Sequence, residues 1–168
     1  MSYKLNNTVQ QFIEKYIDLI DQDDFIQFYD KILDDLGSNW ISSITEVLLL
    51  ADVNPISHFS GMIPKEFLCS ASHIDKMPNI TDNILSIGAY AFAYMDNING
   101  ILDLSKTKLE KLGGHCFVRN HFTEIMLPDT LAYIGPNCFA DCRELRVLQL
   151  PKSIQRIKMN AFKDCREL

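Results

Sequence analysis

The segment LPDTLAYIGPNCFADCRELRVLQLP, residues 127–151, carries most of the signals that decide the fold of this chain. Its motif DCREL, residues 141–145, returns at residues 164–168, and the residues around both copies match as well. A Leu-Pro pair opens the segment at residue 127, and a second Leu-Pro pair closes it at residue 150. The segment is therefore one unit of an internal repeat, and repeats of about 20 to 50 residues are typical of stacked architectures.

Phenylalanines mark the same point of each unit. They stand 25, 25, 22 and 23 residues apart, at Phe67, Phe92, Phe117, Phe139 and Phe162. Five residues before each of them lies an aliphatic side chain, in the order Met62, Ile87, Leu112, Ile134 and Ile157. A unit of this length cannot bury its apolar side alone, so we expect the units to stack and the phenylalanines to form a continuous inner spine.

Short strands and tight turns are predicted within each unit. The run Val147–Leu150 alternates as a strand does, and we expect Leu148 and Leu150 to face the core. A proline follows at residues 128 and 151 and ends the strand, because proline has no N–H to donate to a ladder. The turn before each phenylalanine segment is marked by Gly88, Gly113 and Gly135.

The pattern Leu-Pro-x-x-Ile/Leu-x-x-Ile-Gly-x-x-Ala/Cys-Phe-x-x-Cys-x-x-Leu resembles the BspA-like (Treponema-type) leucine-rich repeats, which occur in bacteria, protists and phages. Residues 127–151 match it almost position for position, and residues 150–168 match it except for Lys158 in place of glycine. The copy around Phe67 is degenerate, with Pro64 and Lys65 where glycine and its neighbour should stand. The resemblance covers about residues 61–168 and implies a short solenoid that binds other macromolecules without catalysis.

We therefore predict an α+β solenoid, in which a small all-α N-terminal cap subdomain at residues 1–60 precedes a leucine-rich-repeat stack at residues 61–168. The stack should contain four to five units, the first degenerate and the last incomplete. Many members of the family are secreted or surface proteins, but this N-terminus shows no secretory signal. We therefore expect a cytoplasmic protein.

The first 60 residues do not join the repeat and are predicted to form about three helices. Apolar stripes at helical spacing run from Val9 to Ile20 and from Phe25 to Leu36, and Gly37 should stop the second helix. A third run, residues 40–50, is apolar on more than one face and is typical of a buried helix. A repeat stack needs a cover over the open core of its first unit, so we expect these helices to cap it.

Charge is distributed unequally along the chain. The net charge is −6, and residues 1–60 hold three lysines against ten acids, whereas residues 61–168 hold thirteen basic residues against twelve acids. This balance argues against nucleic-acid binding, and the longest apolar run is too short to span a bilayer. The acidic helices support an alternative function, a phage or mobile-element inhibitor that blocks a basic site on a host enzyme. The acids include Asp18, Asp21, Asp23, Asp24, Asp30, Asp34 and Asp35.

The sequence shows no motif that requires catalysis, a cofactor or a metal. All five cysteines lie in the repeats, where small reduced thiols would fill narrow buried positions; they are Cys69, Cys116, Cys138, Cys142 and Cys165. The C-x-x-C pairs of structural zinc sites are absent from the sequence. The adjacent His115 and Cys116 could suggest a Cys–His nucleophile. However, alanine fills the position of Cys116 in two other units, so we expect this thiol to be buried and inert.

Outward positions of the strands are the predicted partner-binding surface of a non-enzymatic protein-interaction module. One row comprises Asp103, Met126 and Gln149, with Ile101, Glu124 and Val147 beside it. A second row, one residue before the inward aliphatic position, comprises Lys111, Tyr133 and Arg156. Exposed apolar side chains with a polar rim are what a protein-binding patch needs. We therefore expect a protein partner.

The last unit stops at Leu168, before the strand that should follow, and it has no polar cap. We expect Phe162, Cys165 and Leu168 to form an uncovered end. Three interpretations remain open: a piece of a longer protein, a last half-unit that covers itself poorly, or an end-to-end contact between two copies. We favour a homodimer or another partner at this end.

Overall fold

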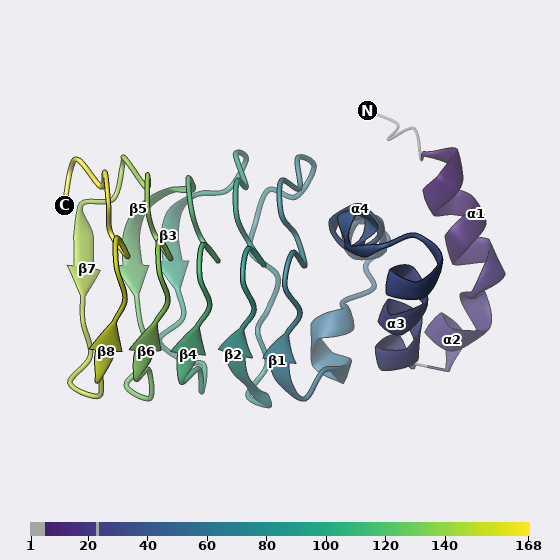
Figure 1. Cartoon of the computed structure of the whole chain (residues 1–168), viewed down its shortest axis with the longest axis horizontal. Coiled ribbons are helices and arrows are strands. Elements are labelled where there is room, and N and C mark those ends of the chain that lie inside the picture. Colours follow the sequence, from purple (N-terminus) through teal and green to yellow (C-terminus); the bar gives the residue numbers. More distant parts are fainter. Residues whose placement is uncertain (1–5, 23) are drawn as a thin grey trace.

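The computed structural model describes residues 6–22 and 24–168, in which helices precede a β-solenoid (Figure 1). The helices lie at one end of the long axis, and the last turn of the stack lies at the other (Figure 1). The helical elements are α1 (Asn7–Lys15), α2 (Ile17–Asp21), α3 (Phe25–Asp35), the 3-10 helix η1 (Ser38–Trp40), α4 (Ile41–Leu50) and the 3-10 helix η2 (Pro55–His58).

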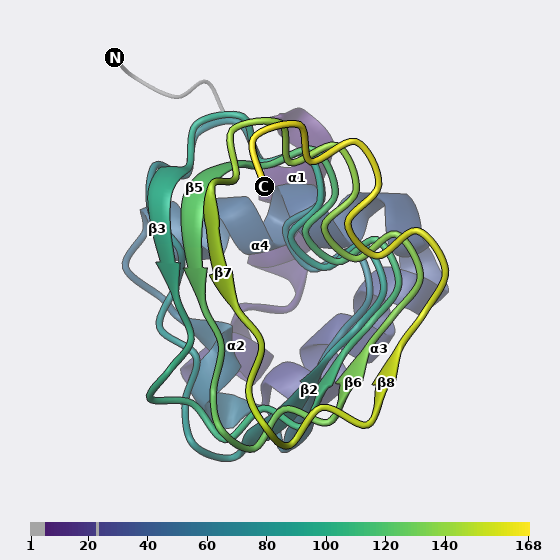
Figure 2. The same ribbon diagram turned by 90° about the vertical axis from the view of Figure 1, so that its left-hand side faces the viewer.

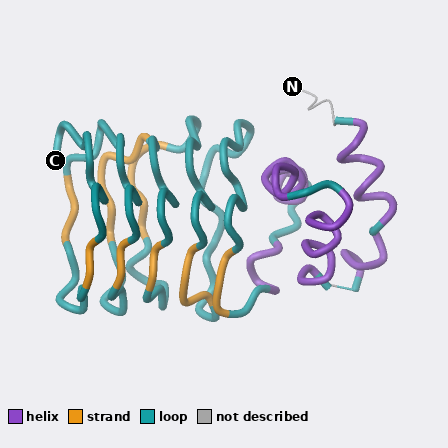
Figure 3. Tube along the Cα trace, in the orientation of Figure 1, coloured by secondary structure: helices purple, strands orange, loops and turns teal. Residues whose placement is uncertain are grey.

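The strands form two parallel sheets. Sheet A has the order β1-β2-β4-β6-β8 and sheet B has the order β3-β5-β7. Figure 2 looks along the stack and shows the two sheets on different sides of the molecule, and Figure 3 shows that loops make up much of each turn. The strands are β1 (Gly61–Ile63), β2 (Ile84–Ile87), β3 (Asn99–Asp103), β4 (Lys111–Leu112), β5 (His121–Met126), β6 (Tyr133–Ile134), β7 (Val147–Gln149) and β8 (Arg156–Ile157).

The predicted phenylalanine spine is confirmed from the second turn onward. Ring centroids of successive turns lie 5.6, 5.5 and 5.5 Å apart, with interplanar angles of 12°, 2° and 5°, for the series Phe92, Phe117, Phe139 and Phe162. The first three of these rings are fully buried. The offset between turns is thus nearly constant, and parallel rings give the core the same cross-section from turn to turn.

The first turn follows a register one residue later than predicted. Main-chain hydrogen bonds align Leu68 with Phe92, because the Leu68 N–H donates to Ala91 O just as the Phe92 N–H donates to Cys116 O. Ile63 pairs with Ile87 and is buried, whereas Met62 is 54% exposed, so the predicted inward position of Met62 is wrong.

Phe67 consequently lies beside the spine and not in it. Its ring meets Phe92 edge-on at 6.0 Å and packs against the cap. On the cap side it stacks on Tyr29 of α3 at 6.0 Å and contacts Phe59 at 5.9 Å. The residue that should have begun the spine thus joins the stack to the helices.

Glycine is required where successive turns approach most closely. A Cβ at Gly113 would lie 2.7 Å from the carbonyl carbon of Gly88, and a Cβ at Gly135 would lie 2.6 Å from that of Gly113. Real side chains do not come this close to backbone, so each glycine lets its turn seat on the one before. Lys158, which replaces this glycine in the last turn, is exposed.

The N-terminal helices cover the first turn, as predicted. Ser42 of α4 donates its hydroxyl to Cys69 O at 2.7 Å, and the buried Glu46 carboxylate accepts the His73 N–H at 2.6 Å. Gly37 stops α3 with a φ of +87°. The stripe from Val9 to Ile20 is not one helix, because it is interrupted between α1 and α2.

At that interruption Tyr16 leaves helical geometry, and its hydroxyl donates to Asp35 of α3 at 2.6 Å. Asp23, one of the predicted acidic residues, lies outside the described residues.

Candidate functional site

Sheet B carries two parallel outward rows across three turns. The register pairs Asp103 with Met126 and Met126 with Gln149, which makes the first row. The second row runs from Ile101 through Glu124 to Val147. The exposed fractions are 61% for Ile101, 51% for Val147 and 40% for Met126. These strands therefore present apolar side chains to solvent on a hydrogen-bonded support.

A groove of about 530 Å³ lies at the carboxyl ends of β5 and β7, against this face. Leu150 lines it and is 43% exposed, so the prediction that Leu150 faces the core is wrong. Its equivalents Leu104 and Leu127 are buried beneath a following turn, whereas Leu150 has no following turn over it among the described residues. The groove is lined by Ser105, Glu124, Ile125, Met126, Leu127, Asp129, Val147, Gln149, Leu150, Pro151, Lys152 and Ser153.

Acidic groups flank the exposed apolar side chains of sheet B. Asp103 accepts the Ser105 N–H at 2.9 Å, and hydrogen bonds from the Ser105 side chain and main chain hold the pKa of this carboxyl below its usual value. Asp103 therefore stays charged well below neutral pH. Glu124 and Asp129 add carboxylates to the groove, against the single cation of Lys152.

The second predicted row lies on sheet A, on a different side of the molecule from sheet B (Figure 2). The register places Lys111, Tyr133 and Arg156 next to one another, and the Lys111 ammonium lies 5.2 Å from the Tyr133 ring centroid. The predicted partner-binding residues therefore lie on two different sheets.

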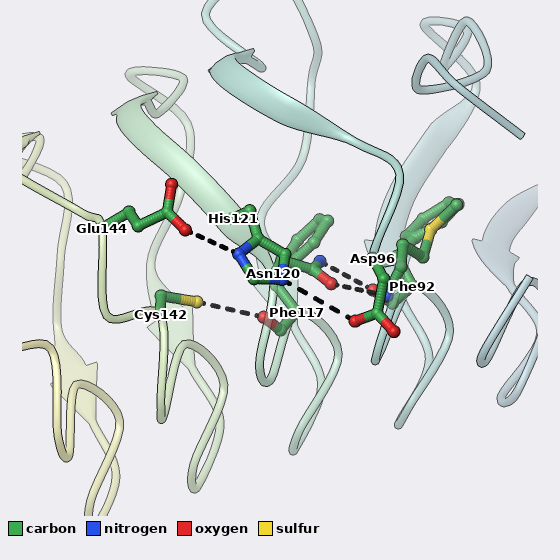
Figure 4. Close-up of polar contacts among 8 residues, drawn as sticks. Phe92, Asp96, Phe117, Asn120, His121, Cys142 and Glu144 are labelled. Atoms are coloured by element: carbon green, nitrogen blue, oxygen red, sulfur yellow. Dashed lines mark hydrogen bonds and ion pairs between the residues drawn. The ribbon is translucent and has the colours of Figure 1, made fainter. Parts of the chain in front are cut away.

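A polar cluster crosses three turns near the beginning of β5, and the sequence analysis missed it (Figure 4). His121 Nδ1 lies 2.8 Å from Glu144 Oε1, and His121 Nε2 lies 3.8 Å from Asp96 Oδ1. Each ring nitrogen thus faces a different carboxylate, so the three groups bridge neighbouring turns and do not converge on one point. The cluster adds a polar rim to the sheet B side.

A buried ladder of polar side chains lies behind that cluster (Figure 4). Asn120, 1% exposed, accepts the Met95 N–H at 2.9 Å and donates its amide to Phe92 O at 2.8 Å. Cys142 makes the equivalent bond to Phe117 O at 3.2 Å. Sequence reasoning missed Asn120 because it compared only apolar positions. The informative signal was asparagine three residues after Phe117, where two later units have cysteine.

All five cysteines are free thiols, and the predicted burial is confirmed for Cys116, Cys138 and Cys142 but not for Cys69 and Cys165, which are only partly buried. Cys116 and Cys138 are fully buried, with their sulfurs 3.3 Å apart, whereas the His115 ring stacks on Tyr90 at 4.5 Å. The two members of the suspected nucleophile pair therefore contact different groups. Burial raises the pKa of Cys138 and raises the pKa of Cys142 to about 12, which makes these thiols poor nucleophiles. Within residues 6–22 and 24–168, no cluster of His, Cys, Asp and Glu is arranged to hold a metal ion.

The three predicted end-contact residues all lie in the last turn. Phe162 is half-buried against Phe139, and Cys165 donates its S–H to Phe139 O at 3.1 Å. Leu168 is 53% exposed, whereas its equivalent Leu145 is fully buried. The last turn thus keeps its contacts to the preceding turn and leaves its other side bare.

This geometry, a stack of short turns with two parallel sheets and inner aliphatic and phenylalanine ladders, defines a leucine-rich-repeat solenoid. A comparison with protein-family models matched residues 63–168 to the BspA type leucine-rich repeat region, in six copies. The chain therefore belongs to the BspA-type leucine-rich repeat family, as the sequence pattern predicts. Comparisons with curated proteins and with solved structures found no match. In the described part of the chain, no helix is long and apolar enough to cross a membrane.

Proposed function

We propose that this chain is a non-enzymatic module that binds a protein partner through the outward face of sheet B. The observation that carries the proposal is that each of three adjoining parallel strands exposes an apolar side chain on the same outward face, namely Ile101, Met126 and Val147. Members of a repeat family with this architecture expose extended surfaces of this kind for binding.

The chemistry of the face defines the partner surface that fits it. Aliphatic or aromatic side chains would cover Met126 and Val147, and the adjoining groove would accept one of them. Asp103, Glu124 and Asp129 favour a partner whose rim carries lysine or arginine. Because the strands are hydrogen-bonded to their neighbours, the surface needs little ordering when it binds.

Point variants on the two sheets test this assignment. The chain is used to capture its partner from the source cell, and the affinity for that partner is then measured by calorimetry. Met126→Glu should weaken binding at least about tenfold, as expected for an anchor at the centre of an interface. Lys111→Glu, a strand-outward change on sheet A, is the matched control and should leave the affinity within about threefold.

Circular dichroism must show that both variants keep the wild-type fold. If Lys111→Glu abolishes binding while Met126→Glu does not, the binding face is sheet A and the proposal is wrong.

The acidic helices support a second candidate, an inhibitor that covers a basic site on another protein. On α3, Ile26 is 59% exposed and Leu33 is 47% exposed; they lie seven residues apart on one face, with Asp30 between them. Apolar contacts framed by carboxylates would suit a basic surface. Binding through this helix should fall steeply between low and high salt, whereas binding through the apolar face of sheet B should change little.

A further inference from the structure

Sheet B has a free edge on the side of the cap. Sheet A begins with β1 in the first turn, whereas sheet B begins only with β3, which is its strand nearest the helices (Figure 1). Beside β3 the first turn passes through residues 74–80, which form no strand. Within the described part of the chain, no main-chain hydrogen bond joins residues 74–80 to β3. β3 is therefore an edge strand, and such an edge is a template for pairing with another chain.

The main-chain groups of Ile101 and Asp103 point toward this edge. The Leu104 N–H donates to Met126 O at 2.8 Å, on the β5 side. Main-chain groups alternate in direction along a strand, and the pairing with β5 is regular from Ile101 to Asp103. Leu102 and Leu104 therefore face β5, and Ile101 and Asp103 each direct an N–H and a C=O group to the opposite side.

A proline explains why the first turn does not pair with this edge. Ile80 corresponds to Leu104 in the repeat, so Pro78 stands at the position of Leu102. A residue at that position donates its N–H to the next turn, and proline has no N–H to donate. Residues 74–80 thus lack a donor that the ladder needs, and they are not the strand that this edge accepts.

A groove of about 1020 Å³ lies at this edge. Residues 73–82 line one side of it, and Asp103 and Leu104 at the end of β3 line the other. Leu50 at the end of α4 and Asp52 after it close the groove toward the cap. The groove therefore lies between the first turn and the free edge, where a further strand would have to enter.

Side chains at the edge define the segment that would fit there. Ile101 and Asp103 are exposed on the outward side, so their cross-strand neighbours should be an aliphatic residue and a lysine or arginine. Ile80 and Leu104 are buried apolar side chains that line the groove, so inward positions of the segment should be aliphatic.

The groove itself favours a basic segment. Aspartates outnumber lysines among its lining residues, four to two, with one histidine in addition. A segment that carries lysine or arginine would meet this excess of carboxylates. The charged lining residues are Asp52, Asp75, Asp82, Asp103, Lys76, Lys106 and His73.

We propose that the free edge of β3 binds an extended basic segment of a partner protein, which adds a strand to sheet B. The main chain of the segment pairs with Ile101 and Asp103, its inward side chains are aliphatic, and the outward side chain beside Asp103 is lysine or arginine. This inference goes beyond the proposed function, because the edge binds through main-chain groups whether or not the outward face of sheet B binds a protein.

The surroundings of the edge argue against a second copy of the chain as its occupant. The first turn and the end of α4 stand beside β3, so two folded copies paired edge to edge would bring these parts into the same space. Such a pairing would also bring the aspartates of two grooves together, and like charges at an interface oppose association.

The probe is a fluorescein-labelled peptide with the sequence threonine-valine-lysine-valine written twice, and the matched control peptide has glutamate in place of lysine. Fluorescence anisotropy is recorded with the full chain. The lysine peptide should bind at least about tenfold more tightly than the glutamate peptide, because it meets carboxylates. Hydrogen exchange should slow at the amides of Ile101 and Asp103 when the lysine peptide is added.

Two N-methylated forms of the lysine peptide distinguish strand addition from binding by side chains alone. One is methylated at the threonines and lysines and the other at the valines, so each lacks the N–H donors along one edge. Only one edge of an added strand faces β3. One form should therefore lose at least about tenfold in affinity, and the other should stay within about threefold of the unmethylated peptide.

The variant Asp103→Lys should weaken the lysine peptide about tenfold or more and strengthen the glutamate peptide, because it reverses the charge at the edge. Glu167→Lys makes the same change of charge at an exposed position in another turn, and it should bind both peptides as the wild type does. Circular dichroism must show that both variants are folded.

Equal affinity for the lysine and glutamate peptides, equal affinity of the two methylated forms, or no binding of the lysine peptide would each overturn the proposal. Unchanged exchange at Ile101 and Asp103 would also overturn it. Sedimentation provides the final arm, because self-association that protects these two amides without peptide would identify a second copy as the occupant and contradict the proposal.

Discussion

Replacing Phe117 by alanine probes the inner spine at its centre. Phe117 is fully buried and stacks on Phe92 at 5.6 Å and on Phe139 at 5.5 Å, with Phe122 edge-on at 6.1 Å. The replacement would leave a cavity the size of a ring between two turns. The turns are held at their spacing by the glycine contacts and main-chain hydrogen bonds, so they cannot close over it.

The expected loss in the free energy of unfolding is about 3–5 kcal/mol, the range measured for buried phenylalanine in other proteins. Phe162→Ala is the matched control, because Phe162 has one stacked neighbour and is only half-buried. About half the contact area is lost there, so its cost should be about 1.5–2.5 kcal/mol. With a urea slope of about 2 kcal/mol per molar, the Phe117 variant should unfold about 2 M earlier than the wild type.

Urea titration followed by far-ultraviolet circular dichroism measures both variants, and fluorescence of Trp40 reports on the cap separately. Because the cap packs on the first turn, both signals should change together in the wild type. Equal losses for the two variants, or a loss below about 1 kcal/mol for Phe117→Ala, would refute a spine that carries the stability of the stack.

Three further changes test other parts of the fold. Gly113→Ala should lower the free energy of unfolding by about 3 kcal/mol, since its Cβ would meet backbone; Gly114→Ala, whose Cβ would lie 3.2 Å from the Pro136 ring, should cost clearly less in thermal melts. Asn120→Leu should cost about 2–4 kcal/mol in urea, because it leaves two buried main-chain groups without partners, whereas Asn120→Cys should cost less; equal costs would exclude the ladder role. Burial raises the pKa of Cys142 to about 12 from an ordinary value of 9.0, so the unfolded chain ionises first. The stability from this group is complete below pH 9 and is lost as the pH rises toward 12, and Cys142→Ala should flatten the decline in urea midpoints between about pH 8 and about pH 10.5.

The solenoid and its spine could be predicted because the repeat encodes them locally. Every unit from Phe92 onward has an aliphatic residue five positions before its phenylalanine. The segment between these two residues repeats in the structure without change. The first unit could not be aligned correctly from the chain alone. Phe67 and Leu68 are adjacent large apolar residues, and only the hydrogen bonds to the second turn decide which of them enters the spine.

The sequence pattern also could not predict that the outward residues lie on two different sheets. Outward positions of Met126 and Tyr133 look alike in the sequence, because both alternate with buried aliphatic residues. A turn that bends between them sends them to different sides of the molecule, and the bend depends on how all turns stack. Leu150 shows the same limitation, since its exposure depends on the absence of a turn beyond it in the structure and not on its own strand.

The close glycine contacts and the fixed spacing between the aliphatic residue and the phenylalanine of each unit also determine where this molecule tolerates insertions and deletions. Between the aliphatic position and the phenylalanine the spacing never varies, so the differences between units of 22 to 25 residues must lie in the rest of each unit, which includes the irregular pairing between Gly100 and Ile101. Duplicating residues 113–134 would therefore add a complete extra turn that begins and ends at the same close glycine contact. The repeat units can therefore be treated as equivalent modules. Adding whole units would widen the proposed binding face without redesigning the interior.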